Sequence, residues 1–278
     1  MGAYETQGRS DHVLLVVTDI TPYRRAHRTL LDVTATQEGH LKEQAARVRA
    51  LNQELEGVVT TFIQQLQLPV ARALNLLGLL CRALGEPPEE VTKPLLNTER
   101  ALQQIVTLFK TMERYMDVRR MPARVRPVDL NRVLREVLKD AQPLLVERDV
   151  RITQDPLPTV QGDSQALSVI FTEYISNALK FTRGRQAAHV HVSVRETESE
   201  YHLGVEDNGV GFNTRQKDKL FQIFGRLHSS SVYEGTGVGL ASARRLAERF
   251  GGRVWAEGKI DQGATFWLAW PKQPTVSQ

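Results

Sequence analysis

Apolar residues recur every seven positions along a segment, Tyr23 to Val59, that is rich in Arg, Gln, Glu, Ala and Leu and has no proline. The repeat consists of Leu41, Val48, Leu55 and Phe62, with Leu51 and Val58 at the intermediate positions and Gln44 as its one polar interruption. A seam this narrow predicts an imperfect coiled coil, which needs a second helix, most simply one from a second copy of the chain. Packing of this helix on its own globule is the alternative.

Two further apolar helices are expected after the seam. The first runs from about Thr60 to Leu84 and stops at a Gly-Glu-Pro-Pro sequence, and the second runs from about Pro88 to Tyr115. Two helices with a short connection form an antiparallel hairpin, and two hairpins form a four-helix bundle. We therefore expect a hairpin over residues 60–119 and a linker over residues 120–127.

The pattern then changes to that of an α/β domain. Asp129 and Asp163 are expected to cap helices that run to about Val146 and Phe181. Further helices are expected at Lys217–Phe224 and Ala241–Phe250. Strands are expected at Val13–Val17, Val150–Ile152, His189–Val194, Tyr201–Val205, Val254–Ala256 and Ala264–Trp270.

Composition limits the class of protein. The 278 residues suggest about two domains, and 41% hydrophobic with 24% charged residues is ordinary for globular chains. A net charge of +4 is too small to argue for nucleic acid or an anionic membrane as partner. The lone Cys81 lies in an apolar run and is interpreted as a buried small hydrophobe. With no secretory signal and no apolar stretch near the ~20 residues of a membrane helix, a cytoplasmic protein is expected.

Two glycine-rich loops are the candidate chemistry. They are Asp207-Asn-Gly-Val-Gly-Phe212 and Gly235-Thr-Gly-Val-Gly-Leu240, and the second opens a helix. Glycines let the backbone approach a ligand, and free N–H groups at a helix N-terminus favour an anion such as phosphate. Neither loop matches a P-loop or a dinucleotide fingerprint.

The order of the motifs is more specific than either loop. The chain reads Glu173-Tyr-Ile-Ser-Asn-Ala-Leu-Lys-Phe-Thr182, the two glycine loops with Phe221-x-x-Phe224-x-Arg226 between them, and Gly263-Ala-Thr-Phe266. This series resembles the catalytic ATP-binding domain of sensor histidine kinases, within the gyrase, chaperone and MutL ATPase superfamily. Arg226-Leu-His228 and Tyr233-Glu-Gly-Thr-Gly237 resemble the phytochrome-type kinases. The match covers about Val128 to Pro271.

The resemblance implies a fold and a set of domains. The fold class is α + α/β: an N-terminal coiled coil and an antiparallel hairpin, forming a dimeric four-helix bundle, followed by an α/β-sandwich ATP-binding domain. The expected domains are the end of a PAS-like sensor domain (1–22), a signalling coiled-coil helix (23–59), the hairpin (60–119), the linker (120–127), the ATP-binding domain (128–272) and a tail (273–278).

The resemblance also assigns roles in binding ATP and Mg²⁺. Asp207 would accept a hydrogen bond from the adenine amino group, with Thr265 supporting it through water. Asn177 would coordinate Mg²⁺, Lys180 would face the phosphates, and Arg226 would neutralise the γ-phosphate. Gly235, Gly237 and Gly239 would form a mobile lid over the nucleotide, and His228 is expected to pack in this lid. The remaining expected ATP-binding residues are Gly209, Gly211, Gly235, Thr236, Gly237, Gly239 and Leu240.

The hairpin departs from the family pattern. Its first helix should carry His-Glu-x-x-Thr/Asn-Pro, and alignment on the proline gives Gln64-Gln65-Leu66-Gln67-Leu68-Pro69. An amide at Gln64 has no nucleophilic nitrogen at neutral pH. The histidines at positions 12, 27, 40, 189, 191, 202 and 228 all lie outside the hairpin. Phosphorylation at the usual position is therefore not expected.

Glu173 is a second departure, since kinases with this type of hairpin usually have asparagine there. Four residues before Asn177, a glutamate resembles the general base of the gyrase, MutL and chaperone ATPases. Glu173 would either complete the Mg²⁺ shell or activate water for slow hydrolysis.

The preferred interpretation is a homodimeric two-component signalling protein of the histidine-kinase family with an ATP site and a degenerate hairpin, a pseudokinase. It would act as a regulator, or as a partner that phosphorylates an active kinase in trans. One alternative is a non-catalytic module that binds a response regulator or a partner kinase through the hairpin. Another is an ATPase with Glu173 as general base. Nucleic acid is not expected as a partner. The signal, the response regulator, and whether the chain is a fragment of a longer sensor stay open.

Overall fold

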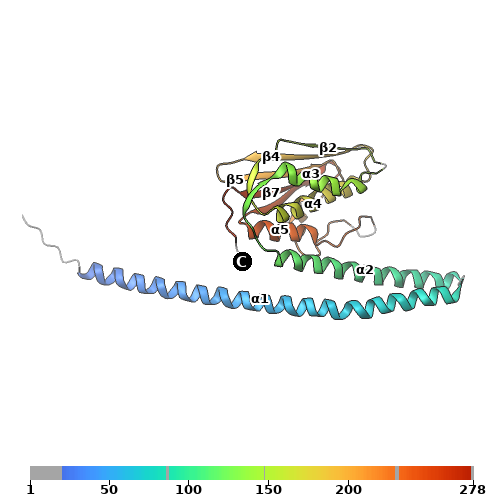
Figure 1. Cartoon of the computed structure of the whole chain (residues 1–278), viewed down its shortest axis with the longest axis horizontal. Coiled ribbons are helices and arrows are strands. Elements are labelled where there is room, and N and C mark those ends of the chain that lie inside the picture. The colour runs from blue at the N-terminus through green and yellow to red at the C-terminus, as the bar shows by residue number, and fades with distance from the viewer. Residues whose placement is uncertain (1–20, 86–87, 147, 229–231, 277–278) are drawn as a thin grey trace, which may run out of the picture. The chain divides into compact units, whose positions relative to one another are not determined.

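The computed structural model describes residues 21–85, 88–146, 148–228 and 232–276. The strand expected at Val13–Val17 and the body of the expected PAS-like segment lie outside the described residues. The described elements are α1 (Thr21–Leu84), α2 (Glu89–Arg120), β1 (Arg126–Asp129), α3 (Leu130–Asp140), η1 (Gln142–Leu144), β2 (Val150–Gln154), β3 (Thr159–Gly162), α4 (Ser164–Phe181), β4 (Ala188–Glu196), β5 (Glu200–Asp207), η2 (Thr214–Lys219), α5 (Gly239–Arg249), β6 (Arg253–Lys259) and β7 (Gly263–Pro271). A helical region followed by a mixed α/β domain confirms the predicted fold class (Figure 1).

The chain divides into two compact units, Met1–Val59 and Thr60–Gln278. The described part of the first unit is the N-terminal length of α1, where the apolar residues of the heptad seam are exposed, Leu41 at 65% and Leu55 at 61%. The sequence predicted a separate helix from Thr60, but α1 is continuous to Leu84 and includes Pro69. No helix in the described ranges has the length and apolar character needed to cross a membrane.

The C-terminal length of α1 and helix α2 form an antiparallel hairpin in the second unit (Figure 1). Gln67 donates a hydrogen bond of 2.8 Å to Glu113, and Arg120 donates one of 3.1 Å to Thr60. α1 ends at Leu84, and the following Gly85 has a φ of +65°, a conformation that glycine adopts without a steric penalty. α2 runs five residues beyond the predicted end at Tyr115, into the expected linker.

The α/β domain is built on a five-stranded sheet in the order β2-β4-β5-β7-β6. Strands β2 and β4 are parallel, and the other neighbouring pairs are antiparallel. A separate two-stranded ribbon pairs β1 with β3, and neither of these four-residue strands was predicted. The strands predicted at His189–Val194 and Tyr201–Val205 are confirmed as β4 and β5, which pair antiparallel.

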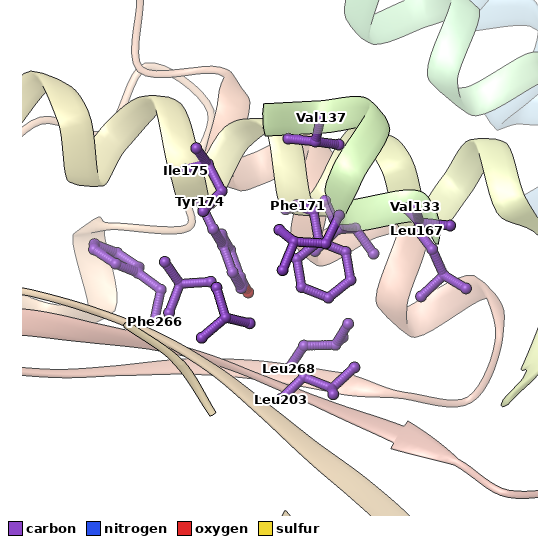
Figure 2. Packing of buried hydrophobic residues seen from close by; sticks show 14 of the residues in the cluster. Val133, Val137, Leu167, Phe171, Tyr174, Ile175, Leu203, Phe266 and Leu268 are labelled. Carbon is purple, nitrogen blue, oxygen red and sulfur yellow. The ribbon is translucent and has the colours of Figure 1, made fainter. Parts of the chain in front are cut away.

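The core lies between the sheet and helices α3 and α4. Figure 2 shows Val133 and Val137 of α3 and Phe171 of α4 pointing toward Leu203 and Leu268 of the sheet. Phe171 is 1% exposed, and the Tyr174 hydroxyl donates to the Trp267 carbonyl. This packing holds α4 rigidly over the sheet, so its polar side chains have fixed positions.

Both predicted N-caps are present. The Asp129 carboxylate accepts from the Asn131 N–H, and the Asp163 carboxylate accepts from the Gln165 and Ala166 N–H groups. α4 ends at Phe181 as predicted. α3 ends at Asp140 rather than near Val146, because a 3₁₀ turn containing a proline follows. The helix predicted at Lys217–Phe224 is a 3₁₀ segment, η2, that ends at Lys219.

Candidate functional site

One cavity gathers most of the residues that the sequence singled out. It lies between one face of α4, the end of β5, the segment that leads into α5, and β7, with an empty volume of about 1000 Å³ that is partly open to solvent. The predicted residues that line it are Glu173, Asn177, Lys180, Asp207, Gly211, Arg226, Gly235, Thr236, Gly237, Gly239 and Leu240.

Asp207 is the last residue of β5 and is 3% exposed. Its Oδ1 accepts a 2.8 Å hydrogen bond from the Gly209 N–H, while its buried Oδ2 has no partner among the described residues. Burial raises the pKa of the Asp207 carboxyl to about 6, against the lowering effect of the backbone N–H groups. A buried acceptor without a donor is rare in folded proteins, so a water or a ligand is expected to supply one here.

Ser176 of α4 lines the cavity with its hydroxyl donated to the Glu173 carbonyl oxygen, and three further polar residues of α4 face the cavity because positions three and four apart share one side of a helix. These are Glu173, Asn177 and Lys180, and Lys180 Nζ donates to Asn177 Oδ1 at 2.9 Å. Desolvation lowers the pKa of the Lys180 ammonium, and the neighbouring Glu173 carboxylate opposes this shift. The α4 face thus offers two oxygen-bearing side chains and one ammonium group to a ligand.

The Glu173 side chain is only 16% exposed, although it is charged and forms an ion pair. Its Oε1 lies 3.2 Å from a guanidinium nitrogen of Arg114 on α2. A Cβ added at Gly239, the first residue of α5, would collide with the Glu173 carboxylate, so the glycine makes room for this side chain. Burial raises the pKa of Glu173, and Arg114 and then Lys180 oppose the rise.

The segment before α5 depends on glycine for its conformation. Gly235 has a φ of +141° and Gly237 a φ of +74°, and a Cβ at Gly237 would lie 2.8 Å from the Gly225 carbonyl oxygen. The segment therefore brings its backbone, and the first N–H groups of α5, to the cavity without intervening side chains.

Arg226 holds this segment in place. Its guanidinium donates to the carbonyl oxygens of Gly235 at 2.5 Å and Tyr233 at 2.7 Å. The rings of Phe181, His228 and Tyr233 form a cluster with centroids 5.1 to 5.5 Å apart. His228 thus packs against Tyr233 of this segment, and Arg226, which lines the cavity, donates to two of the segment's backbone oxygens.

Three of the predicted residues do not line the cavity as the structure describes it. Thr265 alternates on β7 with Ala264 and Phe266, which do line it, so Thr265 belongs to the opposite face of the sheet. Gly209 does not line the cavity, but its backbone N–H donates a hydrogen bond to the Asp207 carboxylate, which does. Gln64 is exposed on α1, in the hairpin.

Arg185 is a site residue that the sequence reasoning missed. It donates to the carbonyl oxygens of Asn208 at 2.9 Å, Gly209 at 3.0 Å and Asp261 at 2.8 Å, and so clamps the loop that follows Asp207. A single arginine after a helix carries no sequence signal of this role. Arg114 was missed for a similar reason, because it lies on a different element from its partner.

The donor set of the cavity fits Mg-ATP. In the described part of the chain, no group of three or more His, Cys, Asp or Glu residues has the arrangement of a protein-only metal site. The oxygens of Asn177 and Glu173 suit a magnesium ion that keeps phosphate and water ligands. The unpartnered Asp207 oxygen suits an amino group of a base.

The comparisons with known proteins agree with this geometry. Residues 162–274 match the family described as histidine kinase-, DNA gyrase B-, and HSP90-like ATPase. The chain is 29% identical over 245 residues to cyanobacterial phytochrome A of Nostoc sp. strain PCC 7120, covering 88% of this chain and 32% of the phytochrome. It is 28% identical over 257 residues to the adaptive-response sensory kinase SasA of Prochlorococcus marinus strain MIT 9303, covering 87% of this chain and 68% of SasA.

Among solved structures, full-length ShkA in complex with AMPPNP matches with a TM-score of 0.55 at 24% identity, covering 78% of this chain and 46% of ShkA. At this identity the likeness shows the fold alone. The chain spans about a third of the length of the phytochromes that it matches.

Proposed function

Residues 162–274 belong to the histidine kinase-, DNA gyrase B- and HSP90-like ATPase family within a chain related to sensor histidine kinases, and from this premise we propose a two-component signalling protein that binds Mg-ATP and is not phosphorylated at the usual hairpin position. The hairpin would then serve as a binding surface for a response regulator or a partner kinase. The observation that carries the ATP-binding part is the unpartnered oxygen of Asp207.

The Asp207 oxygen supports a nucleotide with an exocyclic amino group. Oδ2 is buried at the end of β5 and accepts no hydrogen bond in the described structure, while Oδ1 is fixed by the Gly209 N–H. A carboxylate held in this way by its backbone presents one oxygen in a defined direction. An adenine amino group would satisfy that oxygen and remove the desolvation penalty that raises its pKa.

The other polar groups of the cavity support phosphate and metal binding. Asn177 and Glu173 would hold Mg²⁺ through their oxygens, and Lys180 would turn from Asn177 to the phosphates. The glycines at 235 to 239 bring backbone N–H groups to the same space. Bound Mg²⁺ would supply neutralisation of phosphate charge, which the Lys180 ammonium alone cannot do for the whole triphosphate.

The hairpin supports the absence of self-phosphorylation. Gln64 stands at the acceptor position and is exposed on α1, with the amide of Gln65 beside it and the apolar Leu68 one turn further on. An amide nitrogen cannot attack a phosphoryl group at neutral pH, because its lone pair is delocalised into the carbonyl. The changes at Gln65 and Leu68 remove the neighbouring groups as well, which favours an interaction role for this surface.

The exposed seam supports a homodimer. The apolar residues Val48, Leu51, Leu55 and Val58 are more than half exposed on α1. Contiguous exposed apolar side chains at heptad spacing are stable in water when a second helix covers them. We include a second copy of the chain in the proposal for this reason.

The test is incubation of the full chain with γ-labelled ATP and Mg²⁺, with nucleotide binding measured in parallel by calorimetry. We expect binding of Mg-ATP and no acid-labile label on the chain. Acid-labile label would contradict the proposal, since it would place a phosphorylated histidine on the chain. Absence of ATP binding would contradict it too, and would favour a purely structural interaction module.

A second function, slow ATP hydrolysis with Glu173 as general base, is favoured by the burial and raised pKa of that residue in the cavity. Release of labelled phosphate without labelled protein would support it. Glu173→Gln would then reduce release at least ten-fold while Glu206→Gln, on the opposite face of β5, would leave it unchanged.

A further inference from the structure

The two side chains whose oxygens suit Mg²⁺, those of Asn177 and Glu173, each already contact a positively charged side chain of the protein. Lys180 Nζ donates to Asn177 Oδ1 at 2.9 Å, and a guanidinium nitrogen of Arg114 lies 3.2 Å from Glu173 Oε1. The two cations differ in origin. Lys180 lies on α4 with its partner, whereas Arg114 comes from α2, in the hairpin.

The same stretch of α2 packs on the start of α5 and on the residue just before it, beside the cavity. Tyr115, which is 7% exposed, and Met112 contact Val238 and Ala241. Val238 is the N-cap of α5, and Gly239, which follows it, makes room for the Glu173 carboxylate. One turn of α2 therefore touches both the start of α5 and the acidic residue of the cavity.

Arg114 and a metal ion cannot share the Glu173 carboxylate without a penalty. A guanidinium group is always charged and only donates hydrogen bonds, so it repels a divalent cation on the same oxygens. We propose that Arg114 is a positioning residue of the nucleotide site, which holds Glu173 in the metal-free state and must leave it when Glu173 ligates Mg²⁺. This inference rests on the proposed binding of Mg-ATP.

Reciprocal coupling follows from this competition. If docking of α2 through Arg114 weakens Mg-ATP binding, then Mg-ATP binding weakens the docking of α2 by the same factor. The Arg114 side chain is 59% exposed, so the pair is well screened and the factor is small. For exposed pairs of this kind we expect about a two- to five-fold effect on affinity.

The experiment compares binding of ATP by the full chain in Mg²⁺ and in EDTA, for the natural sequence, Arg114→Ala, Arg114→Lys and the matched control Arg100→Ala, another exposed arginine of α2. Arg114→Ala should tighten Mg-ATP binding about two- to five-fold and should not tighten binding in EDTA. Arg114→Lys and Arg100→Ala should match the natural sequence. In a Glu173→Gln background, Arg114→Ala should have no effect.

A second measurement follows the hairpin itself. Hydrogen exchange of the backbone amides from Met112 to Val118 should quicken when Mg²⁺ and a non-hydrolysable ATP analogue are added together, and not when the analogue is added with EDTA. In Arg114→Ala this exchange should already be fast and should respond little to Mg²⁺.

The outcomes separate the two proposals. If the natural sequence binds no ATP under either condition, the proposed function fails. If it binds Mg-ATP but Arg114→Ala weakens that binding, or shifts it equally with and without Mg²⁺, the competition is wrong and Arg114 contacts the nucleotide or has no part in the site. Exchange at Met112–Val118 that ignores Mg²⁺ would overturn the coupling to the hairpin.

Discussion

The α/β domain buries its apolar residues within one chain, whereas the described hairpin leaves many of its own at the surface. Leu134, Leu167 and Phe171 of the domain are at most 1% exposed. On α1 Ile63 is buried, but Leu76 is 66% exposed, and Leu79 and Leu80 are more than half exposed. The domain has a formed cavity and a buried core, while the hairpin exposes apolar side chains over much of its length. The difference supports the proposal that the domain binds nucleotide and that the hairpin is the surface for association.

The largest expected effect separates the two regions by stability. Phe171→Ala should lower the free energy of unfolding of the α/β domain by about 3–5 kcal/mol, because it removes a fully buried ring between α4 and the sheet. Leu76→Ala, on the exposed face of α1, should change it by less than about 0.5 kcal/mol. The three tryptophans all lie in the domain, so their fluorescence follows its unfolding alone. Equal effects would mean that the regions unfold as one.

A second prediction concerns pH in the absence of nucleotide. Burial raises the pKa of the Asp207 carboxyl from its ordinary 3.8 to about 6 in the folded state, so the folded domain holds this proton more tightly than the unfolded chain does. The stabilisation is fully present below pH 3.8 and is lost as pH rises through about 6, by roughly 3 kcal/mol at most.

Asp207→Asn removes this dependence. The variant should therefore be more stable than the natural sequence at pH 8 and equally stable near pH 4, as measured by urea titration at both values. Glu206→Gln, an exposed neighbour on the same strand whose charge makes the smallest contribution to the Asp207 pKa, is the control and should show a much smaller gap. A gap that is independent of pH would mean that the Asp207 carboxylate is not the cause.

The same substitution should have the opposite sign for binding. Asp207→Asn should weaken ATP about 10- to 100-fold, since a hydrogen bond to a charged acceptor contributes about 1.5–3 kcal/mol. Glu206→Gln should bind ATP as the natural sequence does. Calorimetric titration of both variants would detect the difference, and undiminished affinity in Asp207→Asn would remove the central support for the proposed site.

The smallest expected effects lie in the seam. Gln44→Leu should fill the polar interruption and tighten the dimer by about 1 kcal/mol, while Leu55→Glu should loosen it by at least as much. Gln53→Leu, which adds an apolar residue away from the seam, is the control. Sedimentation equilibrium gives the dimer constant in each case, and a monomer at all concentrations in the natural sequence would show that the exposed seam serves another partner.

The sequence predicted correctly the features that depend on interactions between residues close together in the chain. The capping aspartates Asp129 and Asp163 mark the starts of α3 and α4 because their carboxylates bond N–H groups two or three residues away. Strands β4 to β7 followed from alternation and β-branched residues. The motif order located the cavity residues of α4, which are spaced by helical turns.

The remaining features depend on contacts between distant segments. The choice between Thr265 and Ala264 as a cavity residue depends on the pairing of Ala264 with Asp207, which fixes the face of β7. The stretch predicted as helix around Phe224 instead contains a residue at φ +63°, held by the segment before α5 rather than by its own propensity. The ion pair of Arg114 with Glu173 joins α2 to α4, and no pattern in the sequence indicates that these two residues meet.

The lone oxygen of Asp207 also bears on selectivity among bases. An ionised carboxylate buried beside the cavity can only accept a hydrogen bond. It would therefore bind more tightly a purine that presents an amino group to it. A purine with a keto oxygen in that place would set two acceptors against each other, at a penalty of about 1–3 kcal/mol for the unpaired group. Under the proposed role of Asp207, adenine would therefore be favoured over guanine by this one carboxylate oxygen.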